Sequence, residues 1–133
     1  MIGENITKEL KSKLKIMLKY NFRIHIDSKG NKDKLVFFEK PYELVGQIFD
    51  GNFDQSPQNI QMNTDALISV QNGEIEEHII ANESGFLAIF DDKDDGVYIF
   101  DQFDDSENPL YIVPVEEIIK LLQDFKKFVK ENS

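Results

Sequence analysis

Two short hydrophobic runs in the middle of the chain, 85–90 and 97–103, flank a polar loop at 91–96. Successive side chains of a β-strand point to opposite faces, so as strands both runs would be apolar on both faces. Their short length, their β-branched and aromatic residues and the neighbouring glycines favour strands over a helix. We therefore expect an antiparallel hairpin of two central strands, with both faces of the hairpin covered.

Hydrophobic residues recur at helical spacing near both ends of the chain. Residues 6–18 carry the first apolar stripe, and lysines occupy the rest of that helix surface. Pro114 opens the second helix, where Glu116 and Glu117 in the first turn suit the helix dipole. Its apolar stripe runs to Val129. The core residues predicted from these patterns are Phe86, Ile89, Ile99 and Phe125.

Shorter elements are expected on either side of the central hairpin. Strict alternation of apolar and polar residues predicts a strand over 20–26. A turn over 28–34 joins it to a second predicted strand at 35–39. A proline near the start predicts a short helix over 41–50. A further short strand is expected at 110–113, just before the C-terminal helix.

Two interpretations are open for residues 64–81. The preceding stretch, 50–63, is rich in Gly, Pro, Asn and Gln, which predicts a long surface connection. Asn72-Gly73 is typical of a tight hairpin turn, and we expect a hairpin there. The alternative is a helix over 65–71 that the same dipeptide ends in a left-handed cap. In either case 75–81 forms a strand. Together these elements predict an α+β fold, an antiparallel sheet of about six strands with the N- and C-terminal helices packed on it.

Length and composition restrict the class of protein. A chain of 133 residues is expected to form a single domain over residues 1–133. It has no cysteine, which excludes disulfides and thiolate zinc sites. No apolar run approaches the length of a membrane span, and the N-terminus lacks the apolar region of a signal peptide. We therefore expect a cytoplasmic protein that does not bind membranes.

Charge is distributed very unevenly along the chain. Residues 1–40 carry ten Lys or Arg against five Asp or Glu, whereas 41–114 carry one Lys against sixteen acidic residues. Residues 115–133 balance four against four, and the net charge is −10. A segment with a single cation predicts a one-sided negative field, which attracts basic partners and repels nucleic-acid phosphates. The alternative interpretation is that the acidity serves only solubility.

The sequence offers little for metal or enzyme chemistry. Placing Gly96 at position six of a calcium loop puts Lys93 at a ligand position and Gln102 where glutamate is required. The histidines, His25 and His78, are expected at solvent-facing or edge positions of strands. No nucleophile elbow, phosphate-binding glycine loop or zinc helix occurs. We expect no metal site, no cofactor and no enzymatic activity.

Aromatic residues beside carboxylates suggest a protein interface, because aromatic anchors inside a charged rim are common in tight complexes. The alternative for each ring is a place in the core. The predicted partner-binding residues are Asp91, Asp92, Asp94, Asp95, Asp101, Phe103, Asp104, Asp105, Glu107 and Tyr111.

Residues 70–130 resemble the SUKH superfamily of bacterial toxin-immunity proteins. The resemblance is carried by Asn72-Gly73, by GFLAI from Gly85, by DGVYIFD from Asp95 and by LLQDFKKFV from Leu121. It implies an immunity protein that binds and neutralises a secreted bacterial toxin, often a nuclease. The alternative function is an acidic interaction or regulatory module, or a nucleic-acid mimic, without a toxin partner.

Overall fold

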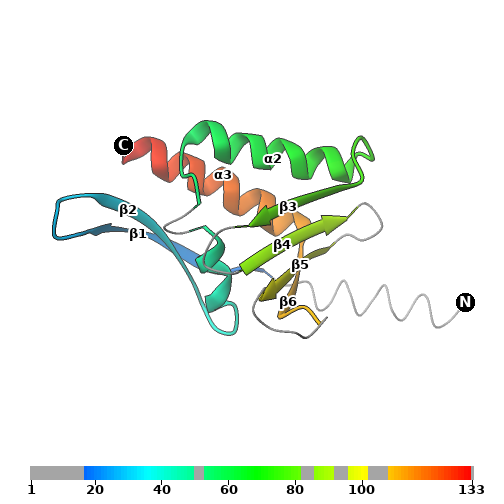
Figure 1. Ribbon diagram of the computed structural model, residues 1–133, viewed down its shortest axis with the longest axis horizontal. Helices are drawn as coiled ribbons and strands as arrows, with labels where there is room; N and C mark the ends of the chain where they lie inside the picture. Colours follow the sequence, from blue (N-terminus) through cyan, green and yellow to red (C-terminus); the bar gives the residue numbers. More distant parts are fainter. Residues whose placement is uncertain (1–16, 50–52, 82–85, 92–95, 102–107, 133) are drawn as a thin grey trace, which may run out of the picture.

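The computed structural model describes residues 17–49, 53–81, 86–91, 96–101 and 108–132 (Figure 1). These residues form six strands, two α-helices and one 3₁₀-helix. In chain order they are β1 (Tyr20–Ile26), β2 (Lys32–Phe38), η1 (Glu43–Ile48), α2 (Pro57–Gln71), β3 (Glu77–Ala81), β4 (Phe86–Asp91), β5 (Gly96–Asp101), β6 (Tyr111–Pro114) and α3 (Val115–Glu131).

The strands divide into two antiparallel sheets. Strands β1 and β2 pair only with each other, and the larger sheet has the order β3-β4-β5-β6. The predicted α+β fold with about six strands is confirmed, although the strands do not form one sheet. The helix predicted over 6–18 lies almost entirely outside the described residues, and 17–19 belong to no helix or strand. No described helix is long and apolar enough to cross a membrane.

The central hairpin predicted from the sequence is β4 and β5, the two inner strands of the larger sheet. Helices α2 and α3 lie across one face of this sheet (Figure 1). Residues that alternate toward the helices are buried, among them Ala88, Phe90, Val97 and Ile99. Of the four predicted core residues, Ile99 and Phe125 are fully buried. The side chains of Phe86 and Ile89 lie outside the described part.

Helix α2 replaces both the long connection predicted up to residue 63 and the hairpin predicted at Asn72-Gly73, and those two predictions are wrong. The Ser56 side chain accepts a hydrogen bond from the Asn59 backbone N–H at 3.2 Å, and Pro57 occupies the first turn. Gly73 follows the helix with φ +73°, a conformation that favours glycine. The alternative of a helix that ends at this dipeptide is therefore confirmed, with a start eight residues earlier.

Polar residues in the buried stripe of α2 explain why its helical periodicity is weak. Asn63 and Thr64 are buried between Ile60 and Leu67. The Thr64 hydroxyl donates to the Ile60 carbonyl at 2.8 Å, and the Asn63 amide donates to the Asn59 carbonyl at 3.0 Å. These bonds satisfy polar groups that burial would otherwise penalise. A buried helix face can thus contain polar residues that a search for apolar periodicity does not find.

The helix predicted over 41–50 is the short 3₁₀-helix η1, which begins two residues after Pro41. It packs against β2 so closely that a Cβ at Gly46 would overlap the carbonyl oxygen of Val36. Val45 and Ile48 of η1 are fully buried. This segment therefore closes the core between the two sheets.

An aromatic cluster attaches the β1–β2 hairpin to α3. The ring of Phe22 stacks on Phe125 and Phe128, with centroids 5.7 and 5.1 Å apart. The strand predicted over 20–26 is present as β1, but of its apolar residues only Tyr20 and Phe22 pack against the core. Further along the same face, Ile24 is 38% and Ile26 is 59% exposed. The far half of the hairpin extends beyond the rest of the fold (Figure 1).

The turn of this hairpin is shorter than the predicted 28–34, because β2 begins at Lys32. The Asp27 carboxylate accepts hydrogen bonds from the backbone N–H groups of Lys29 and Asn31, at 2.8 and 2.9 Å. Gly30 has φ +85°. These bonds, above all those from Asn31, lower the pKa of Asp27. The turn is thus closed by local hydrogen bonds without any contact to the core.

Candidate protein-binding surface

Three of the predicted partner-binding residues lie in the described part of the chain. Asp91 ends β4, Asp101 ends β5 and Tyr111 begins β6. The others lie outside the described residues, namely Asp92, Asp94, Asp95, Phe103, Asp104, Asp105 and Glu107.

The sheet places Asp91 and Asp101 far apart. Asp91 pairs with Glu77 on β3, whereas Asp101 pairs with Phe86 at the other end of β4. Five residues of strand separate these positions, which corresponds to about 17 Å. The two positions also alternate to opposite faces of the sheet. A surface that used both acidic segments would therefore have to span the whole length of the sheet.

Tyr111 lies at the junction between β6 and η1. Its ring packs on the ring of Tyr42, with centroids 5.2 Å apart and planes tilted by 55°. Burial and the nearby Glu43 carboxylate raise the pKa of Tyr111, so its hydroxyl stays protonated at neutral pH. Together with their neighbours the two rings line an open groove of about 490 Å³, whose walls are Pro41, Tyr42, Pro109, Leu110, Tyr111 and Ile112. Tyr111 thus packs partly against the core and partly lines this groove.

On the sheet face opposite the helices, four strand positions form a transverse row. In register across the strands, Ile79 pairs with Ile89, Ile89 with Tyr98, and Tyr98 with Ile112. Ile79 is 47% and Ile112 is 50% exposed. A Cβ at Gly96 would meet the Cγ2 atom of Ile112 at 2.9 Å, so the Ile112 side chain lies over Gly96. No described element covers these two isoleucines. We call this surface the outer sheet face and define it by Glu77, Ile79, Asp91, Tyr98, Phe100 and Ile112.

Two carboxylates border the outer sheet face at one end. Glu77 and Asp91 are direct cross-strand partners, and Glu77 is exposed. Like charges directly opposite each other on a sheet are destabilising. The outer sheet face therefore combines an apolar centre with a negative edge, which suits a partner that presents apolar and basic side chains.

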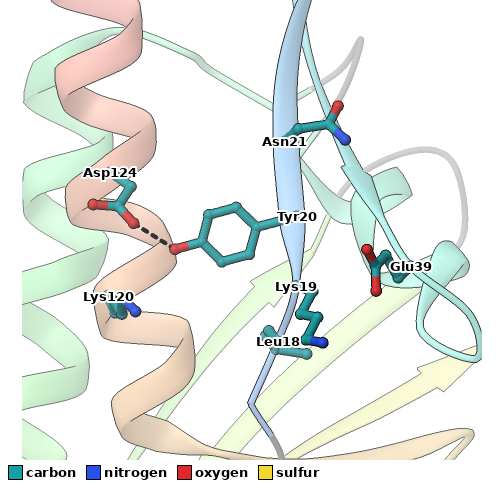
Figure 2. Close-up of a pocket in the computed structure, with 7 residues that line it drawn as sticks. All are labelled: Leu18, Lys19, Tyr20, Asn21, Glu39, Lys120 and Asp124. Atoms are coloured by element: carbon teal, nitrogen blue, oxygen red, sulfur yellow. Dashed lines mark hydrogen bonds between the residues drawn. The ribbon is translucent and has the colours of Figure 1, made fainter.

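A small cavity with a mainly polar lining lies between β1 and α3 (Figure 2). It has a volume of about 350 Å³ and is lined by Leu18, Lys19, Tyr20, Asn21, Glu39, Lys120 and Asp124. Figure 2 shows the Tyr20 ring reaching from β1 toward α3, where its hydroxyl donates to Asp124 Oδ2 at 2.5 Å. Burial and the Asp124 carboxylate raise the pKa of Tyr20 well above its usual value. The phenol therefore stays protonated and connects β1 to α3, and it does not supply a phenolate nucleophile.

His78 is half-buried, although the sequence suggested a solvent-facing or edge position. It does lie on the edge strand β3, where its Nε2 atom is 2.8 Å from Asn63 Oδ1 on α2. Burial lowers the pKa of His78, which favours the neutral ring. The contact with Asn63 requires the tautomer protonated at Nε2, because Asn63 Oδ1 can only accept a hydrogen bond. Sequence reasoning missed this contact because it placed Asn63 in a loop. Within the described residues, no three acidic or histidine side chains gather in a way that could hold a metal ion.

No protein family, curated protein or solved structure matches this chain. The resemblance of residues 70–130 to the SUKH superfamily therefore stays a prediction.

Proposed function

We propose that this protein is an immunity protein that binds a cognate bacterial toxin, of the nuclease class, and neutralises it in the cytoplasm. The observation that carries this proposal is the concentration of negative charge, sixteen acidic residues against one lysine, in residues 41–114. Nucleases bind phosphate backbones through basic grooves. An acidic protein surface can occupy such a groove in place of the substrate.

The placement of the charge supports a protein partner over a small ligand. Glu77 and Asp91 lie next to the exposed side chain of Ile79 on the outer sheet face. Apolar contacts supply affinity, whereas carboxylates steer a basic partner toward the surface and fix its orientation. The SUKH resemblance supports the same class of partner.

Inhibition in this proposal requires no chemistry from the chain. A toxin whose groove or neighbouring surface is covered cannot bind nucleic acid, so stoichiometric binding is sufficient. The exposed carboxylates accelerate the encounter, and the speed matters because the toxin must be captured before it reaches its substrate.

The first step of the test is to look for a large secreted protein encoded immediately beside this chain, whose absence would count against the proposal, and the second step uses the toxin domain of that protein. The purified domain is titrated with the protein while its nuclease activity is followed, and calorimetry measures the complex. We expect inhibition that is complete at one protein per toxin. Absence of a complex, with the nuclease fully active at excess protein, would contradict the proposal and favour an interaction module without a toxin.

A further inference from the structure

Strand β1 has one edge that does not face β2. In an antiparallel pair, the backbone groups of alternate residues point toward the partner strand, and those of the residues between them point away from it. The backbone N–H of Asp27 donates to the Asn31 carbonyl, and that of Glu39 donates to the Lys19 carbonyl, both at 3.0 Å. These bonds flank an unbroken register, so the odd-numbered residues of β1 bond to β2. The backbone N–H and C=O groups that point away from β2 belong to Tyr20, Phe22, Ile24 and Ile26.

This edge is open within the described part of the chain. Strand β1 pairs only with β2, and no hydrogen bond between described residues uses the backbone groups on its other edge. The outer edge of β2 is covered instead. The Gln55 side chain bonds to both backbone groups of Lys34, at 3.3 and 2.6 Å, and Gly46 of η1 packs on the Val36 carbonyl. The hairpin therefore has one covered edge and one open edge.

The open edge lacks the features that commonly protect edge strands. Natural edge strands avoid pairing through proline, lysine, a bulge or a very short length. Strand β1 has seven residues, no proline and no lysine, and its register with β2 contains no bulge. Its arginine, Arg23, lies over the Phe37 ring of the same hairpin, 5.0 Å from the ring centre. Such an edge is a template for a further strand.

Two exposed isoleucines indicate what the added strand must carry. Ile24 is 38% and Ile26 is 59% exposed. They lie on the face of the hairpin where Phe22 stacks on α3. A strand added to β1 places its own alternate side chains beside these isoleucines. The added strand is therefore expected to be apolar at alternate positions.

The sequence of β1 meets this requirement in antiparallel pairing with itself. When Ile24 lies opposite the second copy's Ile24, Phe22 lies opposite Ile26, and Arg23 lies opposite His25. A register centred on Arg23 would place two guanidinium groups opposite each other, which is unfavourable. In the Ile24 register the open groups of both strands face one another and form about six backbone hydrogen bonds. The far half of the hairpin extends beyond the rest of the fold (Figure 1), which leaves it accessible to a second hairpin.

We propose that two copies of the chain form a two-fold dimer in which their β1 strands pair antiparallel about Ile24. The two hairpins then make one four-stranded sheet with the order β2-β1-β1-β2, and the symmetry keeps their apolar faces on the same side. Ile26 of each copy lies beside the second copy's Phe22. The contact uses no residue of the outer sheet face and none of the acidic segment 41–114. It stands or falls independently of the proposed function.

Sedimentation velocity from low micromolar to near-millimolar protein tests the proposal. The contact is small, so we expect a weak, reversible dimer for the wild type. Ile24→Lys and Ile24→Glu should each raise the Kd at least about tenfold, because each variant loses the central apolar pair and places like charges opposite each other. The position is exposed, and circular dichroism checks that both variants fold. Met62→Lys, at an exposed position of α2, is the matched control and should leave the Kd unchanged.

Mixing and cross-linking test the register. An equimolar mixture of Ile24→Lys and Ile24→Glu should associate again, because the two opposite charges face each other across the dimer. The chain has no cysteine, so Ile24→Cys introduces a single thiol, and oxidation should link two copies. Ile26→Cys should link far less, because the two positions 26 lie about 13 Å apart along the strands, beyond the reach of a disulfide.

Three results would overturn the proposal. The first is a wild type that stays monomeric at every concentration, which would leave a strand of a foreign protein as the occupant of the open edge. The second is a dimer whose Kd does not respond to Ile24→Lys. The third is a mixture of the two charge variants that stays monomeric, or equal cross-linking through positions 24 and 26.

Discussion

Tyr20 on β1 and Asp124 on α3 are 104 residues apart in the chain, yet the tyrosine hydroxyl donates directly to the aspartate carboxylate. The bond is partly buried and lines the cavity between the small sheet and the C-terminal helix. Together with the stacking of Phe22 on Phe125 and Phe128, it fixes the β1–β2 hairpin to the rest of the fold.

Tyr20→Phe should lower the free energy of unfolding by about 1–2 kcal/mol, because it leaves a partly buried carboxylate without its donor. The aromatic packing of residue 20 against Phe22 and Phe38 is retained in this variant. Urea unfolding monitored by circular dichroism measures the change. Asp124→Asn, which keeps an acceptor oxygen, is the matched control and should cost less. Equal stability of Tyr20→Phe and wild type would show that the bond contributes nothing.

Phe125→Ala should lower the free energy of unfolding by about 3–5 kcal/mol, as deletion of a fully buried aromatic ring does. The ring is completely buried and stacks on Phe22. Phe37→Ala removes a 43% exposed ring and should cost less than about 1 kcal/mol. Denaturant melts of the two variants compare a core ring with a surface ring. A loss below about 1 kcal/mol for Phe125→Ala would mean that α3 is not docked through this residue.

His78 should make stability depend on pH in the acidic range. Burial lowers the pKa of His78 in the folded protein, whereas a histidine in the unfolded chain has a pKa of about 6.5. As the pH falls, His78 binds a proton in the unfolded chain before it does so in the folded protein, which favours unfolding. The contribution of His78 to stability is therefore complete above about pH 6.5 and decreases below it. His78→Gln, whose amide can also donate to Asn63, should remove this part of the decrease. The free energy of unfolding is measured between about pH 7.5 and about pH 5.

The control for this prediction is His25→Gln, at an exposed position on β1. This variant keeps the contact between His78 and Asn63, so it should retain the part of the decrease that His78 causes. Parallel profiles for wild type and His78→Gln would show that burial does not shift the titration of His78.

Ser56→Ala should destabilise the protein by about 1 kcal/mol through loss of the N-terminal cap of α2. Ser28→Ala, in the exposed turn between β1 and β2, is the control and should have almost no effect. Thermal melts followed at a helical wavelength measure both. An unchanged melt for Ser56→Ala would argue against a helix that starts at Pro57.

Binding to the toxin should depend strongly on salt, because exposed carboxylates act over about 8 Å at physiological ionic strength. Replacing Asp92, Asp94, Asp104 and Asp105 together by Asn should lower the association rate in the same way as added salt. A separate variant, Glu77→Gln with Asp91→Asn, tests the edge of the outer sheet face. Stopped-flow binding across a salt series compares the two variants with wild type. If both bind as fast and as tightly as wild type, the acidic residues serve solubility only.

Regular patterns made the central hairpin and α3 predictable. The run from Gly96 to Phe100 is apolar on both faces and contains β-branched and aromatic residues, and the apolar stripe of α3 continues from Val115 to Val129. Helix α2 was hidden because Asn63 and Thr64 interrupt its buried stripe, and because Asn72-Gly73 favours a hairpin when only neighbouring residues are considered. Only the tertiary structure shows that these buried polar groups have partners, on the same helix and, for Asn63, also on β3.

The candidate surface was partly predictable. The sequence indicated that both faces of β4 and β5 are apolar, but it could not tell which face the helices cover. It also could not show that Asp91 and Asp101 lie at opposite ends of the sheet, since this depends on strand register. The exposure of Ile24 and Ile26 likewise depends on where α3 ends relative to the hairpin. An alternating strand pattern gives no information about that distance.

The stacking of Phe22 on Phe125 and Phe128 has a consequence for the order of events during synthesis. Strand β1 leaves the ribosome about a hundred residues before the helix that it packs on. Until α3 emerges, the packed half of the hairpin has no surface to bind, and its aromatic residues stay in contact with water. Long-range contacts of this kind slow folding. We therefore expect the nascent hairpin to be a site that chaperones recognise, and its docking to be among the last steps of folding.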